Sequence, residues 1–118
     1  MNQDILHQWT EALYSGAYIQ GIYTLRSPDN AFCCLGVLCD LYVKSNPDQW
    51  TLRSNGTYAL GGESSILPDK VAIWAGLAST SPEVTYNEES IEIVELNDEK
   101  GLDFKTIADA LLRTYSAP

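Results

Sequence analysis

Apolar residues near the N-terminus of the chain repeat with the period of an α-helix. They occupy one face of the segment Gln3–Tyr14, at Ile5, Leu6, Trp9, Ala12 and Leu13. This spacing predicts an amphipathic helix whose apolar face packs against the rest of the protein. Gly16 is placed to end the helix, because glycine accepts the left-handed conformation that often follows one.

The same period returns near the C-terminus, after Gly101. One helical face carries the apolar residues Phe104, Ile107, Ala108, Leu111, Leu112 and Tyr115. Asp103 precedes them and is placed to accept a hydrogen bond from the backbone N–H of Thr106 as an N-cap. Leu102 and Ile107 flank this cap at the positions of a hydrophobic staple. The pattern predicts a well-delimited last helix.

The centre of the chain is apolar on nearly every side. The segment Phe32–Tyr42 reads FCCLGVLCDLY, within an apolar run from Ala31 to Val43 that Asn46-Pro47-Asp48 ends. A buried helix and a buried strand are both apolar throughout, but the length and the lack of alternation favour a helix. Gly36 costs such a helix about 1 kcal/mol relative to alanine, so we expect another element to approach closely there.

The remaining segments predict short strands and one more helix. Tyr18–Leu25 is rich in β-forming residues, and Gln49–Leu60 has a central Asn55-Gly56 pair, a strong hairpin signal. Leu67–Gly76 predicts a short helix with Pro68 in its first turn. Ser90–Leu96 fits either a strand or a short helical turn. We therefore expect a single α+β domain over residues 1–118, with three to four helices packed on a short antiparallel sheet or hairpin.

Composition narrows the possible classes of function. The 118 residues are 45% hydrophobic and 19% charged, which suits one folded domain. No apolar run approaches the ~20 residues of a membrane span, and MNQDILHQW lacks the basic start of a signal peptide. We expect a cytoplasmic protein with no membrane partner. The net charge of −9 argues against nucleic-acid binding, which needs a stripe of lysine and arginine.

The acidic excess is concentrated in the second half of the chain. Residues 60–118 hold 11 acidic and four basic residues, and most of the acidic ones lie in Glu83–Asp103. Such a segment is usually a solvated face that keeps a protein soluble. The alternative is a surface that imitates nucleic acid or grips a basic partner.

Three cysteines are the first candidates for chemistry. Cys33, Cys34 and Cys39 lack the paired spacing of a zinc site, and two adjacent cysteines rarely reach one tetrahedral metal. A nucleophilic cysteine would need His7, the one histidine, as its base. Packing in the core is the favoured interpretation, so we predict no catalytic residue, no metal site and no cofactor.

Polar and aromatic groups before the central helix are better candidates for binding. Tyr18, Gln20, Tyr23 and Arg26 lie close together in sequence. Tyrosine rings offer faces for bases or sugars, and arginine offers a planar fork for phosphate or carboxylate. The alternative is the polar edge of a strand.

Three further polar residues complete the set of candidate ligand-binding residues. Asp40 lies at the end of the apolar run, either at the helix surface or in an ion pair with Arg26. Asn97 and Asp98 precede the last helix. They form either a turn that bonds its own backbone or the mouth of a pocket beside the helix N-terminus, which favours anions.

Four sequence blocks follow one another along the chain. They are W-x2-A-L-x-S-G-x-Y-x-Q-G from Trp9, C-C-L-G-V-L-C-D from Cys33, L-P-x2-V-x2-W-x-G-L from Leu67 and L-N-D-x2-G-x2-F-x2-I-A from Leu96. Together they resemble a family of small tailed-phage and prophage proteins. Some small phage proteins sequester the cyclic dinucleotide or cyclic ADP-ribose signals of the host immune systems CBASS and Thoeris. The resemblance thus implies an anti-defence protein that binds a nucleotide-type ligand without catalysis, in an aromatic cavity often shared between subunits of a homo-oligomer. Alternatives are an acidic interaction protein that blocks a host enzyme and a metal-dependent nucleotide hydrolase.

Overall fold

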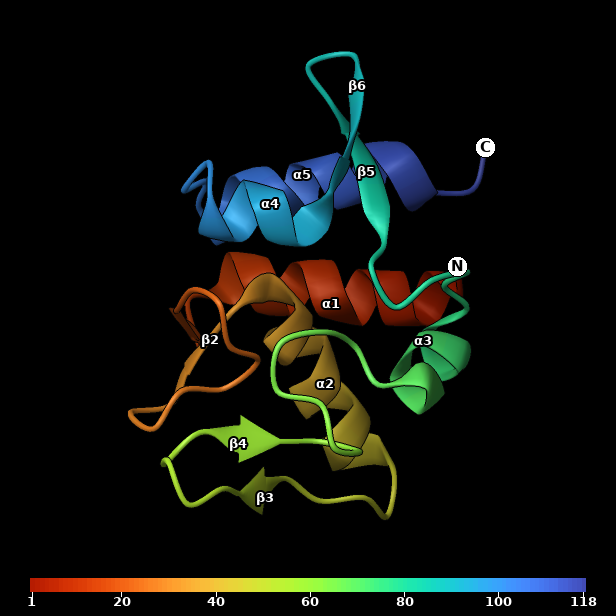
Figure 1. Cartoon of the computed structure of the whole chain (residues 1–118). Helices are drawn as coiled ribbons and strands as arrows, with labels where there is room; N and C mark the ends of the chain where they lie inside the picture. The colour runs from red at the N-terminus through yellow and green to blue at the C-terminus, as the bar shows by residue number, and fades with distance from the viewer.

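The computed structural model describes all 118 residues and places helices from the two ends of the chain side by side. Helix α1 (Gln3–Ser15) lies antiparallel to α5 (Phe104–Tyr115), as Figure 1 shows. Asn2 caps α1, Gly16 ends it with φ of 76°, and Asp103 accepts the expected bond from the Thr106 N–H at 2.9 Å. Both predicted terminal helices are confirmed.

Helix α2 (Cys34–Ser45) packs across α1 on the side opposite α5. Its first six residues are all buried, as expected for a helix surrounded by other elements. A Cβ atom at Gly36 would lie 1.7 Å from the carbonyl oxygen of Leu25, so the predicted close approach is present. The central helix is confirmed, but its predicted start was wrong: Ala31–Phe32 is the strand β2.

A small irregular sheet lies beside α2, with Arg26 in the middle. Strand β1 (Ile19–Gln20) pairs in parallel with β2, and the backbone of Arg26 bridges Phe32 on one side and Tyr58 on the other. Tyr58 belongs to β4 (Tyr58–Ala59), the partner of β3 (Thr51–Leu52) in the predicted hairpin. The sheet is therefore part parallel, not the purely antiparallel sheet expected.

The predicted strand Tyr18–Leu25 is reduced to the two residues of β1. After Gly21 the chain turns, because Tyr23 adopts a left-handed conformation with φ of 67°. A second turn has Asn30 at φ of 61° and brings the chain back as β2. Leu25, between the turns, is fully buried against α2.

The second half of the chain adds one helix more than the sequence predicted. Helix α3 (Asp69–Ala75) confirms the expected short helix, with Pro68 one residue before its first turn. Strands β5 (Glu83–Tyr86) and β6 (Glu89–Glu92) form a hairpin that projects beyond α5 (Figure 1). Helix α4 (Ile93–Asp98) follows β6 directly, so the segment expected to be either strand or helix contains both and brings the helix count to five.

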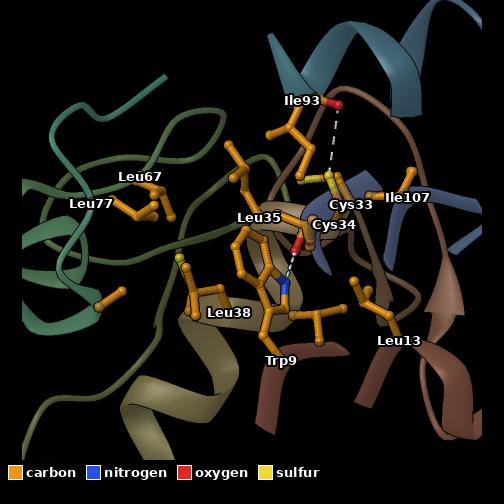
Figure 2. Packing of buried hydrophobic residues seen from close by; sticks show 14 of the residues in the cluster. Trp9, Leu13, Cys33, Cys34, Leu35, Leu38, Leu67, Leu77, Ile93 and Ile107 are labelled. Carbon is orange, nitrogen blue, oxygen red and sulfur yellow. Dashed lines mark hydrogen bonds between the residues drawn. The ribbon is translucent and has the colours of Figure 1, made fainter. Parts of the chain in front are cut away.

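One hydrophobic core connects these elements. Figure 2 shows Trp9 of α1 against Leu35 and Leu38 of α2, with Leu67 and Leu77 on one side and Ile93 and Ile107 on the other. The Trp9 indole N–H donates to the carbonyl of Cys34 at 3.0 Å, so this large side chain is buried without an unpaired polar group. The α+β class is thus confirmed. None of the five helices has the length and apolar character needed to span a membrane.

Candidate functional site

Asp40, near the middle of α2, is the centre of a polar cluster at the helix surface. Its Oδ2 accepts a hydrogen bond from the Tyr18 hydroxyl at 2.6 Å, and its Oδ1 accepts one from the Trp50 indole N–H at 3.0 Å. Lys44, one turn later, places its ammonium 3.3 Å from Oδ2 and 3.2 Å from the Tyr18 hydroxyl. A single carboxylate therefore ties together three segments of the chain.

The protonation of this cluster follows from its contacts. Burial raises the pKa of Asp40, but the hydrogen bonds from Tyr18 and Trp50 and the charge of Lys44 outweigh it, so the net shift is downward. The pKa of Tyr18 is raised, mainly by burial and then by its bond to the carboxylate. Near neutral pH, Asp40 is thus ionised and Tyr18 is a protonated donor.

Arg26 lies beside this cluster in a cage of three aromatic rings. Its guanidinium carbon is 3.9 Å from the ring centre of Tyr58, 5.6 Å from that of Phe32 and 5.7 Å from that of Trp50. All three distances are within the range of cation–π attraction. The Arg26 Nε–H donates to Oδ1 of Asn30 at 2.9 Å, which fixes the plane of the guanidinium.

The remaining nitrogens of Arg26 have no protein partner. Neither Nη1 nor Nη2 makes a hydrogen bond, and no carboxylate lies within 4.0 Å of the guanidinium. No buried side-chain nitrogen or oxygen of the protein lacks a partner, so these two nitrogens are accessible to solvent. They are the donors of a half-buried cation that is free to meet a ligand.

A surface pocket of about 340 Å³ is lined both by residues of the Asp40 cluster and by Arg26. We call it the Arg26 pocket; its polar lining comes from Tyr18, Arg26, Asn30, Asp40 and Lys44. Its apolar wall includes Phe32, which packs edge-on against Tyr18 with ring centres 5.0 Å apart. The pocket thus combines aromatic side chains with a guanidinium that has no ion-pair partner, a combination suited to a small anionic ligand.

Of the two alternatives for Asp40, the ion pair with Arg26 is not formed. Asp40 pairs with Lys44, four residues later on the same helix, and its remaining bonds go to Tyr18 and Trp50. Arg26 is held away from it by the aromatic cage. The sequence did not show this, because the rings come from three separate segments.

A second cluster centres on Asn97, which is 1% exposed. Its Oδ1 accepts from the Gln20 amide at 2.9 Å and from the Cys34 N–H at 3.3 Å. Its Nδ2 donates to the Gly21 carbonyl at 2.9 Å and to Asp98 at 2.8 Å. All four hydrogen-bonding positions of the amide are therefore filled, and Asn97 joins α4 to α2 and to the segment after β1.

Asp98 and Tyr23 extend this second cluster to the surface. Oδ1 of Asp98 accepts from the Tyr23 backbone N–H at 3.0 Å, and the Tyr23 hydroxyl lies 3.3 Å from Glu99. Of the seven residues predicted to bind a ligand, the structure brings Tyr18, Arg26 and Asp40 together in the Arg26 pocket. It places Gln20, Tyr23, Asn97 and Asp98 in the Asn97 cluster, where they bond to one another and to the backbone.

The three cysteines are reduced and buried in the core. Burial raises the pKa of Cys33 to about 11 and those of Cys34 and Cys39 well above the ordinary value of a thiol. Cys34 Sγ approaches the carbonyl of Ile93 at 3.9 Å (Figure 2), and His7 is exposed on α1 without a bond to any thiol. These thiols therefore serve packing rather than nucleophilic chemistry.

No group of three or more histidine, cysteine, aspartate or glutamate side chains is placed to hold a metal ion. Asp40 and Asp98, the carboxylates considered for a hydrolase, belong to different clusters. The two carboxylates therefore do not share one site.

Sequence reasoning missed four residues that hold Arg26 and Asp40 in place. Lys44 had a signal, since an acid and a base four residues apart on a helix are neighbours. Asn30 lies in the turn before β2, and its amide oxygen accepts the hydrogen bond that holds Arg26. Trp50 and Tyr58 gave no signal, because a strand pattern does not reveal which distant side chain its rings will cover.

The family model described as a domain of unknown function, DUF8296, matches residues 1–115. No curated protein and no solved structure matches the chain.

Proposed function

The chain belongs to the DUF8296 family, and we propose that it binds a small nucleotide-type anion in the Arg26 pocket and holds it without chemistry. The observation that carries this proposal is the unpaired guanidinium of Arg26, half-buried among three rings with two free nitrogens. In a chain with a net charge of −9, many carboxylates are available to pair with it. A cation that stays unpaired in a pocket is suited to an anionic ligand.

The other side chains of the pocket support binding rather than catalysis. Tyr18 and Asp40 are bonded to each other, and the raised pKa of Tyr18 makes it a poor base near neutral pH. The aromatic rings of Tyr18 and Phe32 in the lining are side chains that suit contact with a base or a sugar. In the phage setting implied by the sequence resemblance, such binding would sequester an immune signal of the cyclic dinucleotide or cyclic ADP-ribose class.

The direct test measures the response of the melting temperature to a panel of ligands, in the wild-type protein and in the variant Arg26→Gln. We expect a nucleotide-type anion to raise the melting temperature of the wild-type protein, because a ligand at 100 times its Kd adds ~2.7 kcal/mol of stability. The panel comprises cyclic dinucleotides, cyclic ADP-ribose isomers and nucleoside monophosphates. Arg26→Gln should abolish the response, whereas Arg53→Gln, which changes the charge equally outside the pocket, should keep it. A flat wild-type response at millimolar ligand would refute the proposal.

The projecting β5–β6 hairpin favours a second candidate, the blocking of a basic host enzyme. Glu83, Glu88, Glu89 and Glu92 are exposed on this hairpin, and none of them has an ion-pair partner. Charge complementarity would direct such a surface to a positively charged site. The test is recovery of one host enzyme whose activity the protein inhibits. Charge reversal at Glu88, Glu89 and Glu92 should abolish inhibition, and inhibition that survives reversal would remove this candidate.

A further inference from the structure

The charges that line the Arg26 pocket are not equivalent. Lys44 is already matched by Asp40 at 3.3 Å, so these two side chains contribute little net charge to a ligand. Arg26 has no such partner. The attraction for an anion is therefore concentrated at the guanidinium end of the pocket.

Asn30 adds hydrogen-bond donors at the guanidinium end of the pocket. Its Oδ1 is occupied by the Arg26 Nε–H, and its Nδ2 makes no hydrogen bond within the protein. The amide group therefore adds two N–H bonds that no protein group uses, on the residue that holds the guanidinium. This set of donors suits the several oxygens of a phosphate group.

Asp40 gives the pocket a different character at its other end. A carboxylate offers about four acceptor positions, and hydrogen bonds from Tyr18 and Trp50 fill one on each oxygen. The Lys44 ammonium also contacts Oδ2 in an ion pair, so Oδ1 is the less occupied of the two oxygens. A second negative group cannot approach this oxygen without repulsion, whereas a hydroxyl or an amine can donate to it.

We propose that the pocket recognises a phosphate ester whose alcohol part carries free hydroxyl groups, as ribose does. The phosphate lies on Arg26 and Asn30, and a sugar hydroxyl donates to Oδ1 of Asp40. This inference rests on the proposed function and names the part of the ligand that the pocket recognises. A volume of about 340 Å³ is at the lower end for ligand pockets, which fits one sugar-phosphate unit better than a whole dinucleotide.

The experiment compares two small probes, ribose 5-phosphate and methyl phosphate, by calorimetric titration at one pH and ionic strength. The wild-type protein should bind ribose 5-phosphate about tenfold more tightly, because a hydrogen bond to a charged acceptor is worth about one such factor. Asp40→Asn should reduce this preference to less than about threefold. The same variant should bind methyl phosphate more tightly than wild type, because it removes a negative charge and frees Lys44.

The outcomes separate this inference from the proposed function. If both probes bind equally and Arg26→Gln abolishes both, the anion site stands and the recognition of hydroxyl groups is refuted. If neither probe binds the wild-type protein, both the anion site and the recognition of hydroxyl groups are refuted. Equal weakening of the two probes by Asp40→Asn would also refute the role of Asp40. Should that variant not fold, the wild-type comparison and a matched pair of ribose 5-phosphate and 2-deoxyribose 5-phosphate still decide the question.

Discussion

Gly36 of α2 lies against the carbonyl group of Leu25 with no room for a side chain. A Cβ atom at position 36 would be 1.7 Å from the oxygen and 2.6 Å from the carbon of that carbonyl. Both partners are backbone atoms in a fully buried part of the core, so neither can move aside without shifting α2 or the chain that leads to β2. Gly36→Ala should therefore destabilise the protein by about 3 kcal/mol or more, despite the higher helix propensity of alanine.

Urea unfolding of Gly36→Ala measures this cost, and Gly16→Ala is the matched control. Gly16 has φ of 76° and no atom within 4 Å of its would-be Cβ, so it reports the cost of a left-handed alanine alone. We expect about 1 kcal/mol there. Equal losses in the two variants would show that the close contact with Leu25 is not what position 36 requires.

The backbone of Tyr23 is also constrained, but here the constraint is a left-handed conformation and not a lack of space. Its φ of 67° is a conformation that tyrosine rarely adopts, and its side chain is 54% exposed. Tyr23→Gly and Tyr23→Asn should raise the free energy of unfolding by about 1 kcal/mol, because both residues accept this conformation more readily. Tyr23→Val should lower it, since a β-branched residue is strained further. Thermal melts of the three variants give the order, and a stability loss in both Gly and Asn variants would contradict the prediction.

Asn97 should be among the least replaceable polar residues. Asn97→Ala leaves the Gly21 carbonyl and the Cys34 N–H without their bonds to the amide, at a cost of about 2–4 kcal/mol. Asn97→Asp should be no better, because a carboxylate cannot donate to Gly21 and would itself be buried. The control is Asn46→Ala, which removes a single bond to Tyr42 at the end of α2. Chemical denaturation that finds equal losses at positions 46 and 97 would refute the special role of Asn97.

Local signals explain which parts of the fold could be predicted from the sequence. The terminal helices carry their period, their caps and their ends in consecutive residues, so Asn2–Gly16 and Asp103–Tyr115 were predictable. The segment between Gly16 and Cys34 was not, because its conformation depends on distant partners. Asp98 holds Tyr23 in its turn from 75 positions away, and Arg26 forms its bridge with Tyr58 of β4.

The candidate site shows the same limit. Tyr18, Arg26 and Asp40 could be named from residue type, since these groups can bind a polar ligand. Their grouping could not, because Gln20 is close to Tyr18 in sequence and yet bonds to Asn97 in another cluster. Sequence proximity therefore overestimated how many of the seven candidates share one pocket.

The Asp40 cluster predicts a specific dependence of stability on pH. The pKa of Asp40 in the folded protein is lowered, because the hydrogen bonds from Tyr18 and Trp50 and the charge of Lys44 outweigh the effect of burial. A lowered pKa means that the ionised form stabilises the fold above the unfolded pKa of about 4, and that this contribution is lost as the pH falls through the lower folded value. Wild type should therefore lose more stability between pH 6 and pH 2.5 than Asp40→Asn. The two unfolding free energies should converge at the acidic end, where aspartic acid and asparagine are both neutral.

Urea titrations of both proteins at several pH values test this difference directly. Asp48 also has a lowered pKa, caused by its bonds from Tyr42 and Lys70, but it is present in both proteins and cancels in the comparison. Glu11→Gln is the control, because Glu11 is an exposed carboxylate with no hydrogen-bond partner, and its difference from wild type should stay near zero throughout. A difference between wild type and Asp40→Asn that is independent of pH would show that the charge of Asp40 is not what holds Tyr18, Trp50 and Lys44 together.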